Sequence, residues 1–267
     1  MISIIMPAFN AEKYIESAIE SVLNQIFDDW ELIIINDGSY DNTEKIIRRY
    51  KDSRIKCFTQ QNKGASVARN VGLENMSGDY FCFLDADDYL TPGSLEYRIR
   101  KLRINTDIDY LDGKVEIYDK KLVKKIDYWQ PTYRGNPLTP LLNISSICFF
   151  SPTWMIRRVP NKKYQFHEKL SHGEDLLFFI ELALEGGNYD FVEETIMHYR
   201  RGHSSAMTNI KGLENGYHYI FNSLKDLNKV TASQRRSFKL IAQKIIFKSY
   251  LGNYQLINAI LSLMKKW

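Results

Sequence analysis

The feature that most constrains the fold is a regular alternation of apolar runs and helical patterns before residue 90. Strand-like apolar runs cover residues 2–6, 32–35, 55–58 and 80–84. Apolar side chains at helical spacing separate them, over residues 15–26, 41–50 and 66–73. Strands that alternate with helices form parallel sheets, because the helices carry the chain back across the sheet. The sequence therefore predicts an α/β fold with a mostly parallel sheet flanked by helices.

The pattern after residue 92 is less regular. It predicts a helix over 95–102, a hairpin over 108–118 around Gly113, and a long loop over 130–140. A helix over 174–184, short strands over 191–192 and 196–199, and helices from 213 onward follow. We expect one domain over residues 1–210 and a basic helical extension over residues 211–267.

Composition narrows the class of protein. No stretch approaches the roughly 18 consecutive apolar residues of a membrane span. The cysteines Cys57, Cys82 and Cys148 are odd in number and widely spaced, so they fit neither a disulfide framework nor a zinc site. Reduced thiols in a cytoplasmic protein are the expected state.

Charge is distributed unevenly along the chain. Residues 199–267 hold twelve Lys or Arg against two acids, whereas the preceding residues hold 24 bases against 30 acids. Such a basic tail predicts a negatively charged partner, either nucleic acid or an anionic membrane. No nucleic-acid-binding module is recognisable, so we expect no nucleic acid partner.

An acidic cluster follows the apolar run 80–84. Asp85, Asp87 and Asp88 crowd three carboxylates at one strand end, where a bound cation such as Mg²⁺ or Mn²⁺ would relieve their repulsion. An acidic turn without a metal explains the cluster almost equally well. Polar residues also follow the first two strands, in Pro7–Asn10 and Asn36–Ser39. Each loop alone is ordinary turn chemistry, but the three together predict a ligand site at the carboxyl edge of the sheet.

Five segments carry a resemblance to a known family: Ser3–Asn10, Ile34–Ser39 with Asp41 and Thr43, Asn62–Asn70 with Gly72, Asp85–Asp88, and Gly173–Asp175. In this order they resemble the family 2 glycosyltransferases, inverting enzymes of the GT-A fold that use nucleotide-sugars. The resemblance covers about the first 200 residues, the size of one domain. It implies a nucleotide-binding half over 1–105 and an acceptor-binding half over 106–210.

The resemblance also implies roles for individual residues. The residues that would contact the nucleotide are Pro7, Ala8, Asn10, Asp37, Gly38, Ser39, Lys63, Gly64, Arg69, Asp85 and Ala86. Arg69 has a second interpretation of equal weight, as the partner of a nearby carboxylate. Asp87 would bind the divalent metal, Mn²⁺ or Mg²⁺, that bridges the diphosphate.

The segment His198–Ser205 is similar to a Tyr-Arg…His-Ser stretch of many relatives. His203 would complete the metal site, since imidazole suits Mn²⁺, or the diphosphate site. Arg200 and Arg201 would contact phosphate. His198 is expected to pack within a strand.

Asp175 is the expected general base. An inverting transfer needs a carboxylate to take the acceptor hydroxyl proton and a cation to stabilise the departing nucleoside diphosphate. The resemblance places that base at the second acid of Glu174-Asp175. The alternative is that both acids merely favour the positive end of a helix. We expect a UDP-hexose donor before GDP- or dTDP-sugars, and a glycan or lipid-linked glycan acceptor.

Three other functions compete with this one. A nucleotidyltransferase would have glycine in the loop after the first strand, and Pro7–Ala11 has none. A dinucleotide-dependent oxidoreductase would need G-x-G-x-x-G, which is missing. A non-catalytic glycan-binding subunit that kept the fold would not release nucleoside diphosphate from a donor, whereas the enzyme would.

The end of the chain predicts an amphipathic helix over 255–266. Its apolar arc contains Leu256, Ile257, Ile260, Leu261, Leu263 and Met264, and its other side contains Asn258, Ser262, Lys265 and Lys266. With Trp267 at headgroup level, this helix would attach a cytoplasmic enzyme to the inner face of the cell membrane. Docking on the body or on a second subunit is nearly as strong an alternative. The helix over 234–251 is expected to pack on the catalytic domain.

Overall fold

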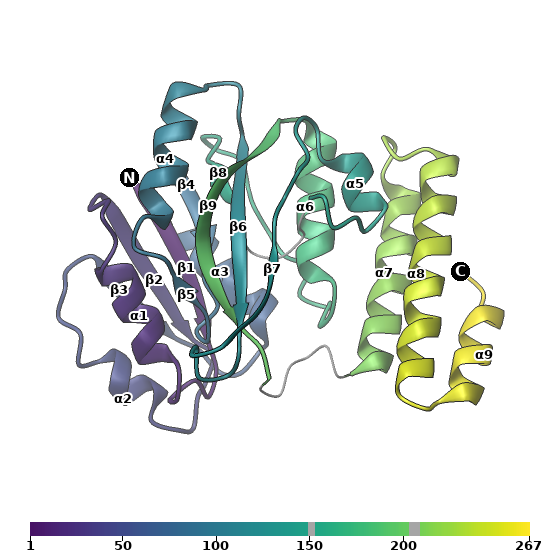
Figure 1. The fold of residues 1–267 in the computed structure, drawn as a ribbon, viewed down its shortest axis with the longest axis horizontal. Helices are drawn as coiled ribbons and strands as arrows, with labels where there is room; N and C mark the ends of the chain where they lie inside the picture. Colours follow the sequence, from purple (N-terminus) through teal and green to yellow (C-terminus); the bar gives the residue numbers. More distant parts are fainter. Residues whose placement is uncertain (149–152, 203–208) are drawn as a thin grey trace.

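The computed structural model describes residues 1–148, 153–202 and 209–267. These residues form one nine-stranded mixed sheet with helices on both faces and a row of helices beside it (Figure 1). The expected α/β architecture with a helical C-terminal extension is confirmed.

The first half of the chain forms the parallel part of the sheet. Strands β3 (Ile55–Thr59), β2 (Trp30–Asn36), β1 (Ile2–Ala8) and β4 (Tyr80–Phe83) lie in this order and pair in parallel. Helices α1 (Ile15–Leu23), α2 (Thr43–Ile47) and α3 (Ala65–Asn75) connect them. The carboxyl ends of β1, β2 and β4 therefore meet at one edge, as the sequence predicted.

Both faces of this parallel sheet are buried, which explains its continuous apolar runs. Ile4 points into the core shared with α1 and helix α4 (Ser94–Ile104). Its neighbour Ile5 points into the opposite core, shared with α3 and helix α6 (Glu174–Glu185). Successive side chains of a strand point to opposite faces, so each strand feeds two cores.

The second half extends the same sheet with mixed pairing. Beyond β4 come β8 (Met155–Arg157), β6 (Tyr110–Tyr118), β9 (Tyr189–Arg200) and β5 (Tyr89–Leu90). Strand β7 (Lys125–Trp129) pairs with β6. Helix α5 (Leu138–Leu142) begins within the segment 130–140 that was predicted as a loop and extends beyond it. The two short strands expected over 191–199 are one long strand, β9.

The hairpin predicted around Gly113 is wrong. Residues 110–118 form the single strand β6, which runs parallel to β9. A Cβ atom at Gly113 would lie 2.6 Å from Ile196 and 2.9 Å from Val192. Glycine at this position therefore allows a close approach of two strands, not a turn.

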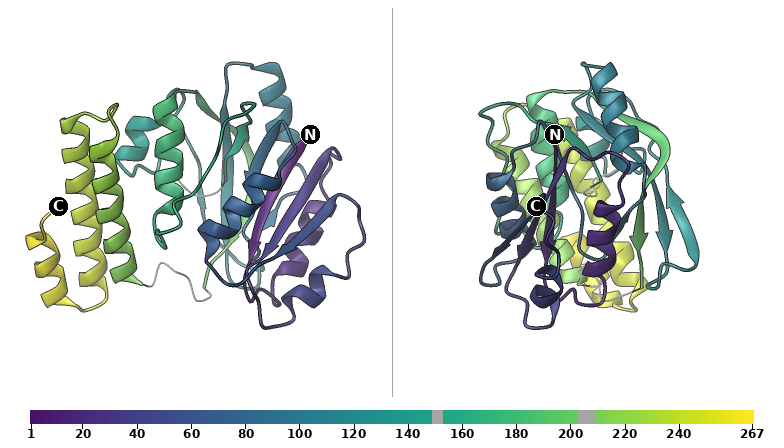
Figure 2. Two further views of the ribbon diagram at one scale, coloured as in Figure 1. Left: turned by 180° about the vertical axis from the view of Figure 1, so that it is seen from behind. Right: turned by 90° about the vertical axis from the view of Figure 1, so that its left-hand side faces the viewer.

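Helices α7 (Ile210–Asp226), α8 (Ala232–Gly252) and α9 (Leu256–Met264) form the extension. Phe238, Ala242, Ile246 and Tyr250 of α8 are buried in the core that also contains α6, so α8 packs on the body as expected. Figure 2 shows the extension from behind, with α9 on the side farthest from the sheet. Within the described part of the chain, no helix is long and apolar enough to cross a membrane.

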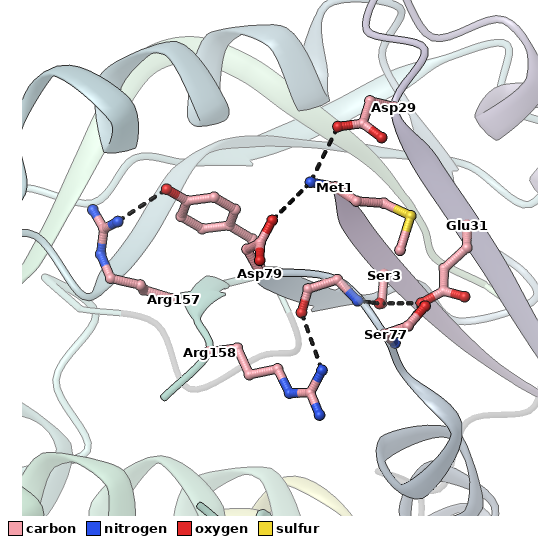
Figure 3. A network of polar contacts seen from close by, with 10 residues as sticks. Met1, Ser3, Asp29, Glu31, Ser77, Asp79, Arg157 and Arg158 are labelled. Carbon is pink, nitrogen blue, oxygen red and sulfur yellow. Dashed lines mark hydrogen bonds and ion pairs between the residues drawn. The ribbon is translucent and has the colours of Figure 1, made fainter. Parts of the chain in front are cut away.

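A polar network ties the strands together at the amino end of the sheet (Figure 3). The buried Glu31 carboxylate accepts hydrogen bonds from Ser3 Oγ and Ser77 N, both at 2.6 Å, and from Lys56 Nζ at 2.7 Å. Burial raises the pKa of Glu31, but these donors outweigh it and lower the pKa to about 2. This network lies at the edge opposite the predicted site and links β1, β2, β3 and the start of β4.

Candidate active site

The loops after β1 and β2 are bound to each other. Asn10 N donates to Ser39 Oγ at 3.0 Å, and Tyr40 N donates to Asn10 Oδ1 at 3.0 Å. Ala11 N donates to Thr43 Oγ1 at 2.7 Å, and Asp41 accepts from the Thr43 hydroxyl. Asp41 and Thr43, which the sequence motif includes without a role, therefore fix the two loops that carry the predicted nucleotide contacts.

Asp37 organises the next segment. Its carboxylate is 3% exposed and accepts from Lys63 N at 2.9 Å, Gly64 N at 2.8 Å and Gln60 Nε2 at 2.7 Å. Gly38 has a φ of 72°, and a Cβ there would lie 2.7 Å from Asn62 N. The Asp37 carboxylate thus holds Lys63 and Gly64 in place, and its own contact with a nucleotide stays a prediction.

Arg69 is the centre of the site. Its guanidinium, on a side chain that is 5% exposed, lies 3.0 Å from Asp85 and 3.2 Å from both Glu174 and Asp175. These acids come from the loop after β4 and from the first turn of α6, so one cation from α3 joins both halves of the chain. Of the two interpretations of Arg69, its position matches the carboxylate partner.

The start of α6 sets the position of Glu174 and Asp175. Gly173 precedes the helix with a left-handed φ of 76°, a conformation that glycine adopts without strain. Two acids in a first turn also suit the positive helix end, so this alternative for the pair is physically sound as well. It does not exclude a catalytic role, because the Asp175 side chain remains 21% exposed.

The electrostatic environment makes Asp175 a weaker acid than usual. Burial raises its pKa most, the Arg69 cation lowers it, and the negative charges of Glu174 and Asp85 raise it again. The result is a pKa of about 8. A carboxylate with a pKa near neutrality is well matched to accepting a proton from a hydroxyl.

The acidic turn after β4 is held by Arg200. Asp88, which is buried, accepts from Arg200 N at 2.9 Å, and Arg200 Nε donates to the Asp87 carbonyl oxygen at 2.7 Å. The Arg200 guanidinium also donates to the Lys120 carbonyl oxygen at 2.8 Å. Arg200 therefore supports the turn, and its contact with phosphate stays a prediction.

The chemistry of this turn fits a divalent cation. Burial, and after it the negative charges of Asp87 and Asp85, raise the pKa of Asp88 well above its usual range. Among the described residues, no group of three His, Cys, Asp or Glu side chains could hold a metal. Phosphate oxygens and water would have to complete the coordination, as is common for Mg²⁺. His203 lies outside the described residues.

His198 packs within β9, as expected. Its ring stacks 5.7 Å from Tyr89 and lies 4.6 Å from Tyr118. Of the remaining predicted residues, Pro7 and Ala8 are the last two residues of β1, and Ala86 lies in the acidic turn after β4.

A model of the family described as "Glycosyl transferase family 2" matches residues 3–165, which contain the bound loops, Arg69 and the acidic turn. The chain belongs to glycosyltransferase family 2. An uncharacterized glycosyltransferase of Haemophilus influenzae is 38% identical over 198 residues, which are 69% of this chain and 72% of that protein. The Escherichia coli protein named UDP-Glc:alpha-D-GlcNAc-diphosphoundecaprenol beta-1,3-glucosyltransferase WfgD is 40% identical over 124 residues, 46% of this chain and 49% of its own.

Solved structures show that this family 2 glycosyltransferase has the GT-A fold. Staphylococcus aureus TarS 1–349 in complex with UDP-GlcNAc superposes with a TM-score of 0.73 over 97% of this chain and 79% of its own, at 22% identity. The mannosyltransferase PcManGT from Pyrobaculum calidifontis, in complex with GDP-Man and Mn²⁺, has a TM-score of 0.61 over 98% of this chain and 74% of its own, at 14% identity.

Two supporting residues of the glycosyltransferase, Glu174 and Asn70, belong to the sequence motifs, but their contacts were not predicted. Glu174 shares Arg69 with Asp175, and Asn70 exchanges two hydrogen bonds with the Phe166 backbone, at 2.7 Å and 3.0 Å. The guanidinium carbon of Arg69 lies over the ring of Phe166, 5.4 Å from the centre of that ring. The signal in the sequence was the pair of polar residues Arg69-Asn70 among the apolar positions of α3, since buried polar residues need partners.

Proposed function

We propose that this glycosyltransferase moves a sugar from a nucleoside diphosphate donor to a hydroxyl of a glycan or lipid-linked glycan, with inversion at the anomeric carbon. The observation that carries the proposal is the triple ion pair of Arg69. It joins Asp85, at the end of the nucleotide-side strand, to Asp175, at the start of α6. A reacting sugar held between a donor site and a base requires this proximity.

Asp175 is the proposed general base. Its carboxylate accepts the proton of the acceptor hydroxyl while the hydroxyl oxygen forms a bond to the anomeric carbon. The bond from that carbon to the diphosphate oxygen breaks, and the nucleoside diphosphate leaves with the electron pair. Arg69 contacts one oxygen of the Asp175 carboxylate and holds the side chain in position, while part of the side chain stays exposed.

Asp87 is the proposed protein ligand of Mn²⁺ or Mg²⁺, and His203 a second one. When bound, the cation would neutralise the charge that develops on the leaving diphosphate. The Arg200 side chain holds the backbone of Asp87 in position by donating a hydrogen bond to the Asp87 carbonyl oxygen. Asp85 is proposed to contact the ribose of the donor, with the loops after β1 and β2 and the segment at Lys63 around the nucleotide.

We propose a UDP-hexose as donor. TarS binds UDP-GlcNAc and the Escherichia coli relative is named for a UDP-Glc donor, whereas PcManGT binds GDP-Man. The name of the same Escherichia coli relative includes a diphosphoundecaprenol-linked sugar, which favours a lipid-linked acceptor.

Release of nucleoside diphosphate from a panel of nucleotide-sugars, with Mn²⁺ or Mg²⁺, tests the proposal. One donor should be turned over far faster than the others, and Asp175→Asn should abolish most of this turnover. Glu168→Gln, at an exposed acid in the chain segment before α6, is the matched control and should react normally. A protein that turns over no donor with either metal, or an Asp175→Asn variant as active as wild type, would contradict the proposal.

A further inference from the structure

Helix α9 exposes its apolar side to solvent. Six side chains, which we call the α9 outer face, are between 49% and 75% exposed: Leu256, Ile257, Ile260, Leu261, Leu263 and Met264. Helix α9 itself lies on the side of the molecule farthest from the sheet (Figures 1 and 2). Contiguous exposed apolar side chains of this kind mark sites of interaction with proteins or membranes.

The opposite side of α9 fixes the helix on the body. Ala259 and Ser262 are buried, and these small residues let α9 lie close to α8. Lys265 binds the buried Glu214 of α7 at 2.9 Å. Trp267 stacks on His218 of α7 at 4.0 Å, so it is packed on the body and the headgroup position predicted for it is wrong. Docking on the body, which the sequence left open as an alternative to membrane attachment, therefore applies to one side of α9. The apolar side remains exposed.

The surroundings of this face are cationic. Residues 227–267 contain eight Lys or Arg and no Asp or Glu. Lys244, Lys248 and Lys266 are exposed. The preceding acid Glu214 is buried and bound by Lys211 and Lys265, so its charge is compensated inside the protein. Since α9 follows α8 after the short turn 253–255, the last turns of α8 lie beside it.

We propose that the α9 outer face docks on the surface of an anionic lipid bilayer. Apolar side chains enter the boundary between headgroups and acyl chains, while the lysines around them attract anionic lipid. A second copy of this chain is the weaker partner, because it would bring the same cations against one another. Tyr254, which is 99% exposed in the turn before α9, is suited to the headgroup level.

This inference deepens the proposed function and rests on it in one respect, the lipid-linked acceptor. A docked enzyme would meet such an acceptor at the membrane surface. Vesicle binding itself does not depend on the transfer reaction, so the two can fail separately.

Co-sedimentation of the full chain with vesicles tests the apolar part of the surface. In low salt, the protein should bind vesicles of phosphatidylglycerol and phosphatidylcholine. The triple variant Ile257→Ser, Ile260→Ser and Leu261→Ser should bind at least about tenfold more weakly, because less apolar surface is buried. The control variant Ile26→Ser, Ile104→Ser and Val123→Ser changes equally exposed apolar residues elsewhere and should bind like wild type.

A second variant tests the charges. Lys244→Gln, Lys248→Gln and Lys266→Gln together should weaken binding to the anionic vesicles by on the order of tenfold to a hundredfold. High salt should do the same to wild type. Lys45→Gln, Lys51→Gln and Lys163→Gln, at exposed lysines on the body, form the control and should have little effect.

Two results would overturn the docking proposal. One is equal vesicle binding by wild type and the apolar triple variant. The other is light scattering that shows a dimer of the full chain which this variant converts to a monomer, without vesicle binding by either; the face would then belong to a second copy. Donor turnover without vesicles should be the same in both proteins, so a failure of docking is distinguishable from a failure of the proposed transfer reaction.

Discussion

Arg69 Nη1 lies 3.2 Å from Asp175 Oδ1, although the two residues are 106 positions apart in the chain. Arg69 also binds Asp85 and Glu174, and Asp175 lies in the first turn of α6. Their contact therefore reports how the two halves of the chain are joined, and it makes the chemistry of Asp175 dependent on α3.

The activity of the wild-type enzyme should rise with pH through neutrality. The pKa of Asp175 is raised to about 8, and a general base is inactive while protonated. kcat/KM, which reports the free enzyme, should therefore be low at acid pH and should increase with an apparent pKa of about 8. A profile that is already flat from about pH 5 would show that the pKa of the base is not raised in the enzyme.

Replacing Arg69 should shift that profile to higher pH. The Arg69 cation lowers the pKa of Asp175, so Arg69→Met removes this effect and should raise the apparent pKa of kcat/KM. Because three carboxylates lose their buried partner, the free energy of unfolding of the variant should also be about 3 kcal/mol lower than that of wild type. Arg69→Lys retains a charge and should shift the pH profile less. If the folded Arg69→Met enzyme has an unchanged pH profile, Arg69 does not affect the pKa of the catalytic base.

Asp175→Asn should retain donor binding and lose about 10²–10⁴-fold in kcat, the usual contribution of a general base. Titration calorimetry with UDP measures the first property and steady-state turnover the second. The wild-type product, examined by NMR, should have the inverted anomeric configuration. A retained configuration would contradict both the assigned base and the single-displacement mechanism.

Asp87→Ala should remove the effect of metal on nucleotide binding. In wild type, UDP with Mn²⁺ should raise Tm more than UDP with a chelator, because a ligand that binds the folded state stabilises it. In the variant the two conditions should give the same Tm. Asp28→Ala, at an acid whose side chain is 89% exposed, is the control and should behave like wild type. A full metal effect in Asp87→Ala would place the cation on other ligands.

Glu31→Gln should destabilise the fold without affecting the reaction. The pKa of Glu31 is lowered to about 2 in the folded protein, so its ionised form stabilises the fold above the usual carboxyl pKa, and this stabilisation is lost as pH falls toward 2. Urea unfolding at pH 7 should show a loss of about 1.5–3 kcal/mol, and a smaller loss at about pH 3. Glu44→Gln removes a surface ion pair with Arg48 and should destabilise the fold much less than Glu31→Gln.

The sequence predicted the parallel sheet because its strands are apolar on both faces and because apolar residues recur at helical spacing in the segments between them. It did not predict β7 or β8, and it did not predict that residues 110–118 form one strand, β6. The partners of these strands come from distant segments of the chain. Gly113 was assigned to a turn because glycine has that role locally, whereas only the position of β9 explains it.

The candidate site was predictable as a set of loops at one edge. Its internal contacts were not, because a motif names residues without their partners. Arg69 illustrates this limit, since its three acids lie 16 or more positions away in the sequence. Trp267 illustrates a second limit. The sequence around a terminal tryptophan does not distinguish a side chain that faces lipid from one that, as here, stacks on a histidine, His218.

The Glu31 network at the amino end of the strands has a consequence for engineering this enzyme. Stabilising mutations often reduce activity when they stiffen the catalytic residues themselves. Glu31 and its donors, however, lie at the opposite edge of the sheet from the loops after β1, β2 and β4. New hydrogen bonds or better packing around this network could therefore raise heat tolerance while leaving the turnover rate unchanged.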